Sequence, residues 1–215
     1  MNKCGVWMIF SYYEVKGLPV VIIDEYYSEN AARLIWQELC FLNSSPDKFL
    51  DPKDTGSAWT ENKDGGKNYL RKNKALPLDL VYSNRAISDI LSANRKIFTK
   101  DIVDQLEKLH VYFRTLDGIG NDATLINYYE NSDYYLPHVD MSCCTALTWF
   151  FKQPKSFTGG QLVIEEELKI ECVYNRAVIF PSMLKHSVES TVVEPSLVGQ
   201  NYGRYAITQL MSHKI

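Results

Sequence analysis

The spacing of hydrophobic positions changes near residue 123, from a helical pattern to short alternating runs. In the first half, the apolar stretch 18–27 predicts a strand, and the segment 29–42 repeats its apolar residues at the spacing of one helical face. Ser28 stands directly before that segment, where its hydroxyl can accept a hydrogen bond from a free amide of the first helical turn. We therefore expect a strand followed by a capped amphipathic helix. The predicted buried face of the helix consists of Leu34, Ile35, Leu39 and Leu42.

The middle of the chain has a weaker pattern. Residues 43–83 are rich in Asn, Ser, Pro, Asp and Gly, which predicts irregular structure. Within them, the basic run 67–74 is compatible with a solvated loop, and also with a mobile segment that covers an active site and contacts substrate. Two short helices are predicted at 84–96 and 100–109, with Thr99 as the N-cap of the second.

The second half consists of short apolar or alternating runs separated by turn residues. Many short strands with turns between them are typical of a β-sandwich or barrel. The helices of the first half would then pack on the outside of the sheet. The predicted strands are 123–129, 144–151, 161–165, 168–173, 176–181, 187–193 and 204–211.

Length and composition fit a single domain. The chain has 215 residues, and 46% of them are hydrophobic, which is enough to form a buried core. Within one domain spanning 1–215, we expect residues 1–122 to supply helical support and strands, and residues 123–212 to form the β core. The net charge is −3, whereas proteins that bind nucleic acid in bulk usually carry a basic excess. Nucleic acid is therefore disfavoured as a partner.

The cysteines and the first residues bear on the cellular compartment. The chain has five cysteines, an odd number, and no pair has CxxC spacing, so neither a zinc ribbon nor a disulfide framework is predicted. We expect reduced thiols in a cytoplasmic protein. The apolar run 5–10 is too short to span a membrane and lacks a small-residue cleavage site. It predicts an early strand, with no signal peptide and no membrane partner.

The first candidate for chemistry is the sequence His138-Val139-Asp140. On an extended segment, residues i and i+2 point to the same face, so this imidazole and this carboxylate can reach one ion. The motif is short enough to occur by chance. A structural contact between histidine and aspartate explains it equally well.

His186 and Arg204 extend this pattern. His186 follows an apolar strand that could run beside the strand carrying His138 in a sandwich. Two imidazoles and one carboxylate form a facial triad with open metal positions, which is diagnostic of non-haem iron(II) oxygenases. Arg204 lies on an apolar strand, where a charge is costly without a partner and a guanidinium suits a carboxylate. Taken singly, His186 could be an ordinary hydrogen-bonded histidine, and Arg204 could place its head at a sheet edge.

A family resemblance is carried by segments that occur in a fixed order. Four such segments, together with the predicted strand and helix of 19–39, resemble the 2-oxoglutarate/Fe(II)-dependent dioxygenases. The resemblance is closest to the prolyl 4-hydroxylase-like branch of that family. The resemblance covers most of residues 19–42 and 123–212, whereas 43–122 match no pattern of the family. The segments are NYYENSDYYLPHVD (127–140), FTGGQLVI (157–164), NRAVIFPSMLKHSVESTVV (175–193) and GRYAITQLM (203–211).

The resemblance implies a mainly β (α+β) fold, a double-stranded β-helix or jelly roll with flanking N-terminal helices. It implies that His138, Asp140 and His186 are the catalytic iron ligands, and that Arg204 binds the distal carboxylate of 2-oxoglutarate. The implied cofactor is Fe(II), with 2-oxoglutarate and O2 as co-substrates, and the requirement could include ascorbate. The reaction would couple oxidative decarboxylation of 2-oxoglutarate to hydroxylation of an unactivated C–H bond.

Tyr129 matches the family tyrosine that often reaches the same carboxylate. Tyr128 points to the other face of the strand, so only one of the two can do so, and Tyr129 is preferred. Two departures from the family pattern stand out. The interval from the second histidine to the arginine is 204 − 186 = 18 residues, longer than usual, which indicates a surface insertion at 194–201. Ala206 stands where relatives often carry a hydroxyl, so one contact to the co-substrate is missing or moved.

The expected substrate is a prolyl residue in a peptide or protein, and a small molecule or free amino acid is the alternative. A catalytically inactive binding module on the same fold is the alternative function. A cupin would carry HxH with a glutamate, and a nucleic-acid demethylase would carry a second arginine where Leu210 stands. The oligomeric state stays open. Nearby aromatic residues could line the site, although as a group they fit a core better: Tyr134, Tyr135, Trp149, Phe150 and Phe151.

Overall fold

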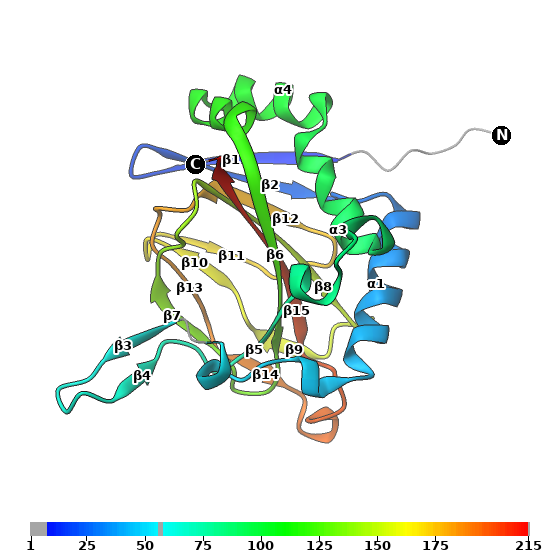
Figure 1. Ribbon diagram of the computed structural model, residues 1–215, viewed down its shortest axis with the longest axis vertical. Coiled ribbons are helices and arrows are strands. Elements are labelled where there is room, and N and C mark those ends of the chain that lie inside the picture. The colour runs from blue at the N-terminus through cyan, green and yellow to red at the C-terminus, as the bar shows by residue number, and fades with distance from the viewer. Residues whose placement is uncertain (1–7, 56–57, 215) are drawn as a thin grey trace.

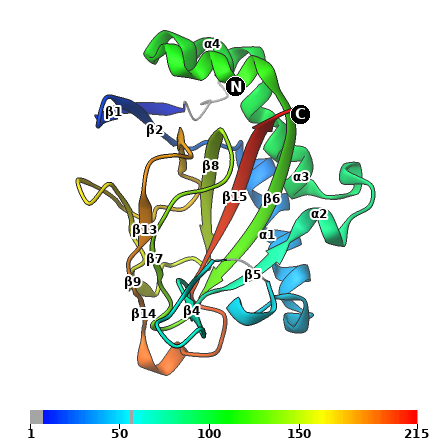
Figure 2. The same cartoon turned by 60° about the vertical axis from the view of Figure 1, so that its left-hand side comes forward.

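The computed structural model describes residues 8–55 and 58–214. Two antiparallel sheets pack face to face, and helices lie against the outer face of the larger sheet (Figure 2). In the described part of the chain, seven strands form the larger sheet, and both halves of the sequence contribute to it. In order across this sheet they are β1 (Ile9–Val15), β2 (Leu18–Asp24), β12 (Ala177–Pro181), β8 (Cys144–Phe151), β15 (Arg204–His213), β6 (Ile119–Tyr129) and β5 (Lys74–Pro77).

The smaller sheet lies across from it. Its strands are, in order, β11 (Leu168–Ile170), β10 (Leu162–Ile164), β13 (His186–Val188) and β7 (Tyr135–His138). A short pair extends this layer, β9 (Phe157–Gly159) with β14 (Thr191–Val193). A separate hairpin of β3 (Trp59–Glu61) and β4 (Lys67–Tyr69) projects from the body of the molecule near β7 (Figure 1).

Helices come mainly from the first half of the chain. The α-helices are α1 (Glu29–Asn43), α2 (Leu78–Val81), α3 (Asp89–Asn94) and α4 (Lys100–Leu109). The 3-10 helices are η1 (Pro46–Lys48), η2 (Pro52–Asp54), η3 (Arg85–Ile87), η4 (Arg95–Phe98), η5 (Val111–Gly118) and η6 (Pro195–Leu197).

Alternation along the strands of the larger sheet divides the core into two layers. On β2, Val21 and Ile23 pack against the helices, whereas Val20 and Ile22 pack between the two sheets. Both faces of this strand are covered, which explains its uninterrupted apolar run. Each such side chain contributes about 1.5–3 kcal/mol on full burial.

The predicted helix at 29–42 is confirmed as α1, and the Ser28 hydroxyl accepts from the Ala31 amide at 3.3 Å. The helix at 100–109 is confirmed as α4, although its N-cap Thr99 donates its hydroxyl to the Lys96 carbonyl instead of capping the helix. The prediction of one continuous helix at 84–96 is wrong. Ser88 interrupts it, because its side chain caps α3 and also donates to the buried Glu38 carboxylate.

The strand predictions hold best where both faces are covered. The strand at 144–151 is confirmed as β8, and the strand at 204–211 is confirmed within β15. The predicted strand at 18–27 ends at Asp24, because Glu25 adopts a left-handed conformation with φ of 52°. The predicted strand at 187–193 is two strands, β13 and β14. Of the early strand predicted at 5–10, residues 5–7 lie outside the described residues.

Residues 43–83 correct the sequence-based interpretation. This segment contains β5, which pairs with β6 and so belongs to the larger sheet, in place of the irregular structure expected. The solvated-loop interpretation of 67–74 is wrong for two of its members, because Arg71 and Asn73 are buried. The reason is long-range pairing: Leu136 donates its amide to the Leu70 carbonyl at 2.7 Å, which holds the segment against β7.

The two facing sheets with flanking helices confirm the predicted mainly β jelly roll. Among the described residues, Cys40, Cys143, Cys144 and Cys172 form no disulfide, whereas Cys4 lies outside the described residues. Among residues 8–55 and 58–214, no helix is both long and apolar enough to cross a membrane.

Candidate metal centre

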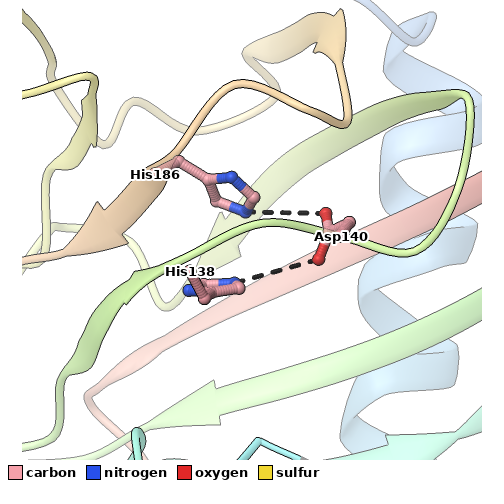
Figure 3. Close-up of side chains that lie close together, drawn as sticks. All are labelled: His138, Asp140 and His186. Carbon is pink, nitrogen blue, oxygen red and sulfur yellow. Dashed lines mark ion pairs between the residues drawn. The ribbon is translucent and has the colours of Figure 1, made fainter.

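Three side chains from two neighbouring strands of the smaller sheet converge at one point. His138 ends β7 and His186 begins β13, and the two are direct partners across these antiparallel strands. Asp140 follows β7 by two residues. Its Oδ1 lies 3.8 Å from His138 Nε2, and its Oδ2 lies 3.5 Å from His186 Nε2. All three side chains point toward one another (Figure 3), and one ligand atom from each lies within 4.8 Å of the others.

Backbone carbonyls orient both imidazoles. His138 Nδ1 lies 2.8 Å from the Leu136 carbonyl oxygen, and His186 Nδ1 lies 2.9 Å from the Leu184 carbonyl oxygen. A carbonyl can only accept, so each Nδ1 carries the proton and each Nε2 presents a lone pair to the shared point. This is the usual outer-shell arrangement of a metal-binding histidine.

The aspartate is held in the same way. Thr145 donates its hydroxyl to Asp140 Oδ2 at 2.7 Å, and the Asp140 amide donates to the Ser182 carbonyl at 3.1 Å. The Ser182 hydroxyl in turn lies 2.8 Å from the Thr145 hydroxyl. The second carboxylate oxygen, Oδ1, accepts no hydrogen bond from the described residues and is left for a ligand.

Burial keeps the first histidine neutral. Desolvation, followed by the charge of His186, lowers the pKa of His138 to about 4, and the neighbouring Asp140 only partly opposes this. The Tyr135 ring stacks on the His138 imidazole with ring centroids 3.6 Å apart, which covers it from solvent. A neutral imidazole is the form that binds a metal.

The triad opens into a cavity of about 320 Å³ between the two sheets. Arg204 lies on its wall and is only 1% exposed. None of its three side-chain nitrogens has a hydrogen-bond partner among the described residues. An unsatisfied buried polar group costs about 1–3 kcal/mol, and a charged one costs more. A bound carboxylate would satisfy the guanidinium, so a dicarboxylate spanning the triad and Arg204 fits the cavity.

Strand register separates the two candidate tyrosines. Tyr129 is the direct partner of Arg204 across β6 and β15, and its ring lies 4.1 Å below the guanidinium on the cavity wall. Burial raises the pKa of Tyr129 to about 12 even though the Arg204 charge lowers it, so the phenol stays protonated and can donate. Tyr128 faces the helices, and its hydroxyl donates to the Glu130 carboxylate at 2.8 Å. Of the two tyrosines, Tyr129 is therefore the one that lines the cavity beside Arg204, on the face that strand alternation predicts.

The two departures from the family pattern also have a place in the structure. Residues 194–201 contain η6 and are largely exposed, as expected for a surface insertion. Ala206 lies on the cavity wall, and Thr208, two residues further along the same face, also lines it. The Thr208 hydroxyl accepts from the Asn127 side chain at 3.3 Å.

The aromatic residues near the motif divide between cavity and core. Tyr135 and Trp149 line the cavity, whereas Phe150 packs toward the helices and Phe151 packs between the sheets. Tyr134 lines a separate outer groove. The expectation of a core holds for Trp149, which is buried in the cluster between the sheets and also lines the cavity, and Tyr135 packs against that cluster.

Sequence reasoning missed Arg71. This arginine is buried on the wall of the metal cavity, although it lies 138 − 71 = 67 positions before His138 in the sequence. The sequence signal was only an arginine within a basic run. Its burial follows from the pairing with β7, where Arg71 forms a bridge with Tyr135.

Comparison with known proteins supports the geometry. Residues 123–211 match the family model described as the 2OG-Fe(II) oxygenase superfamily. No curated protein sequence matches the chain. Among solved structures, a prolyl-4-hydroxylase from Pseudomonas putida is similar with a TM-score of 0.59 at 13% identity, covering 91% of this chain and 92% of that one.

A second solved structure, of prolyl 4-hydroxylases from Phytophthora capsici, is similar with a TM-score of 0.54 at 13% identity. The similarity covers 90% of this chain and 58% of that one. At these identities the two structures show a shared fold. The family match implies Fe(II), 2-oxoglutarate and O2, which agrees with a triad of two histidines and one aspartate. Residues 123–211 are therefore similar to the 2OG-Fe(II) oxygenase superfamily, which supports a 2-oxoglutarate-dependent dioxygenase, and the chain has the fold of the prolyl 4-hydroxylases.

Proposed function

We propose that His138, Asp140 and His186 bind Fe(II), and that Arg204 binds the distal carboxylate of 2-oxoglutarate beside Tyr129. The observation that carries this proposal is the buried Arg204 guanidinium, which has no partner among the described residues and shares a cavity with the triad. A guanidinium in this setting requires an anion. The co-substrate would supply that anion and also a ligand to the metal.

The residues of the chain have separable roles in this proposal. Bound Fe(II) with 2-oxoglutarate and O2 supplies the oxidising chemistry that hydroxylates an unactivated C–H bond. The backbone carbonyls hold each imidazole so that Nε2 faces the metal, and Thr145 fixes the aspartate. Arg204 and Tyr129 orient the co-substrate, and Trp149 with Leu147 keeps water from the cavity wall.

We propose a prolyl residue in a peptide or protein as the substrate. Two observations support it. The metal cavity adjoins an outer groove of about 980 Å³, which is large enough for an extended chain. The two similar structures above are described as prolyl 4-hydroxylases. We further propose that residues 1–215 form one domain, in which residues 1–122 support the core 123–212. The reaction would use ascorbate as an added reductant. The protein would be located in the cytoplasm.

The test is a turnover assay. Protein loaded with Fe(II) is incubated with 2-oxoglutarate, ascorbate and a panel of proline-containing peptides, and succinate and peptide mass are measured. We expect peptides to stimulate succinate release and to gain the mass of one oxygen atom. Oxidation of small molecules or free amino acids, with no peptide oxidised, would show that the substrate is of the other class. An absence of 2-oxoglutarate consumption under every condition would instead indicate an inactive binding module.

A further inference from the structure

Arg71 lines both the metal cavity and the larger outer groove. Backbone pairing fixes its position, because the Lys72 amide donates to the Tyr134 carbonyl at 3.1 Å and Arg71 bridges to Tyr135. The arginine is therefore held beside β7, at the end where that strand leads to the metal ligand His138.

The Arg71 guanidinium is buried without a carboxylate partner. It is 5% exposed and donates to two neutral acceptors, the Asn73 carbonyl at 2.6 Å and the Thr55 hydroxyl at 2.9 Å. Within residues 8–55 and 58–214 it takes part in no ion pair. Burial lowers the pKa of Arg71, but an arginine remains charged in a protein.

The proposed metal and co-substrate do not neutralise this charge. With both bound, the charges of Fe(II) and Arg204 would be balanced by Asp140 and the two carboxylates of 2-oxoglutarate. The cavity wall also carries Asp54, but this carboxylate is exposed and forms no ion pair with Arg71 among the described residues, so the buried Arg71 charge would still have no paired anion. A buried charge of this kind is stabilised by a ligand that brings an opposite charge.

The outer groove continues the positive charge. Three of its lysines are exposed, and none of these takes part in an ion pair among the described residues: Lys53, Lys67 and Lys74. A fourth, Lys72, lies 3.7 Å from the Asp133 carboxylate, so its charge is already paired. The three exposed lysines come from three elements of the groove wall, namely η2, β4 and the start of β5.

Acidic groups only partly offset this charge. Besides Asp133, the groove wall carries Asp51 and Glu130. Glu130 already accepts from the Tyr128 hydroxyl at 2.8 Å and from the Asn131 amide at 3.1 Å. The chain as a whole has a net charge of −3, so a positive groove at the mouth of the cavity is not a consequence of overall charge.

We propose that Arg71 and the groove lysines select an acidic peptide. In the bound peptide, Arg71 pairs with a carboxylate side chain that lies next to the residue to be hydroxylated. This inference rests on the proposed function, whose substrate class it narrows. The lysines act on acidic residues further along the peptide and speed its encounter with the site. The negative net charge of the chain favours a peptide over nucleic acid as the bearer of these charges.

A binding experiment tests the proposal apart from turnover. The protein, loaded with Fe(II) and 2-oxoglutarate without oxygen, is titrated into a fluorescein-labelled proline-containing peptide that carries glutamates, and into the same peptide with glutamines. We expect the glutamate peptide to bind about tenfold more tightly or better, and added salt to reduce the difference. Arg71→Gln should remove most of the preference, whereas Arg114→Gln, an exposed arginine outside both walls, should keep it.

Surface variants keep the test decisive if Arg71→Gln does not fold. The double variant Lys53→Gln/Lys74→Gln changes only exposed side chains and should weaken binding of the glutamate peptide alone. Lys74→Glu should shift the preference toward a lysine-containing peptide. Equal affinity of the wild-type protein for the glutamate and glutamine peptides would overturn the proposal. Tighter binding of a single-stranded oligonucleotide of equal charge would overturn it in favour of nucleic acid.

The same peptides in the turnover assay separate this inference from the proposed function. If the glutamine peptide is hydroxylated as readily as the glutamate peptide, the prolyl function stands and the acidic preference is wrong. If the glutamate peptide binds selectively and neither peptide is hydroxylated, the groove selects acidic chains but proline is not the target.

Discussion

Replacing Arg204 with methionine should raise the stability of the free protein and lower its affinity for 2-oxoglutarate. The variant removes a guanidinium that is 1% exposed and whose three nitrogens have no partner among the described residues, and it puts an apolar side chain of similar length in the same space. Replacing buried charges with apolar groups stabilises some proteins by about 1–4 kcal/mol. For a chain of this size, that corresponds to an increase in Tm of roughly 2–4 °C per kcal/mol.

The co-substrate complex should lose affinity. Removing one partner of a buried charge pair costs about 2–5 kcal/mol, because the other charge stays buried and unpaired. At about 1.4 kcal/mol per factor of ten, Arg204→Met should raise the Kd for 2-oxoglutarate roughly 30-fold to several thousand-fold. Fe(II) affinity should change far less, because the arginine is not among the three residues that converge as potential ligands.

Thermal unfolding with and without 2-oxoglutarate measures both effects in one assay. Wild-type protein should gain stability from the co-substrate, and Arg204→Met should start from a higher Tm and gain little. Arg176→Met is the control, since Arg176 pairs with Asp24 at 2.6 Å, and the cavity lining does not include it. The reasoning is refuted if Arg204→Met binds 2-oxoglutarate as the wild type does, and more so if Arg176→Met or Lys185→Met abolishes binding.

Three further predictions concern the same cavity. Thr145→Ala should weaken Fe(II) binding about 10–100-fold, because the Thr145 hydroxyl orients Asp140, the proposed carboxylate ligand, and Thr145→Ser should restore the affinity. Equal metal affinity in both variants would remove the positioning role of Thr145. Tyr129→Phe should raise the KM for 2-oxoglutarate whereas Tyr128→Phe should not, and the reverse result would exchange their roles. Gly160→Ala should weaken 2-oxoglutarate binding, measured by titration. Gly160 has φ of +68°, and an added Cβ would lie 2.9 Å from Nε of the buried Arg204. Unchanged affinity would mean that the Arg204 side chain moves freely.

Two of the three triad residues, His138 and Asp140, could be predicted together because their signal is local. Asp140 follows His138 by two residues on an extended segment, which places both on one face, and this needs no knowledge of the fold. The same alternation separates Tyr129 from Tyr128 and places Arg204 on the cavity side, because β15 pairs with β6 in regular register from Arg204 to Ser212. The sequence could suggest that His186 lies beside His138 only as a possibility, since that pairing joins distant strands.

The remaining features depend on long-range contacts that leave no periodic signal. Arg71 is buried because its segment pairs with β7, although its neighbours Lys72 and Lys74 are exposed and the run has the composition of a loop. β5 is a strand because it extends the edge of the larger sheet at β6. The helix at 84–96 breaks because Ser88 bonds to a glutamate on α1, a partner that its own sequence neighbourhood does not reveal.

Binding of Fe(II) by the triad underlies every role proposed above for the residues of the cavity. Fe(II) bound to the purified chain should be counted under anaerobic conditions in the wild type, in His138→Ala, in His186→Ala, and in His110→Ala as a matched control. The control histidine accepts from the Tyr112 amide and is not part of the triad. We predict one Fe(II) per chain in the wild type and in the control, and loss of the metal in both triad variants, since affinity depends on all three ligands. Undiminished Fe(II) in both triad variants would contradict the account.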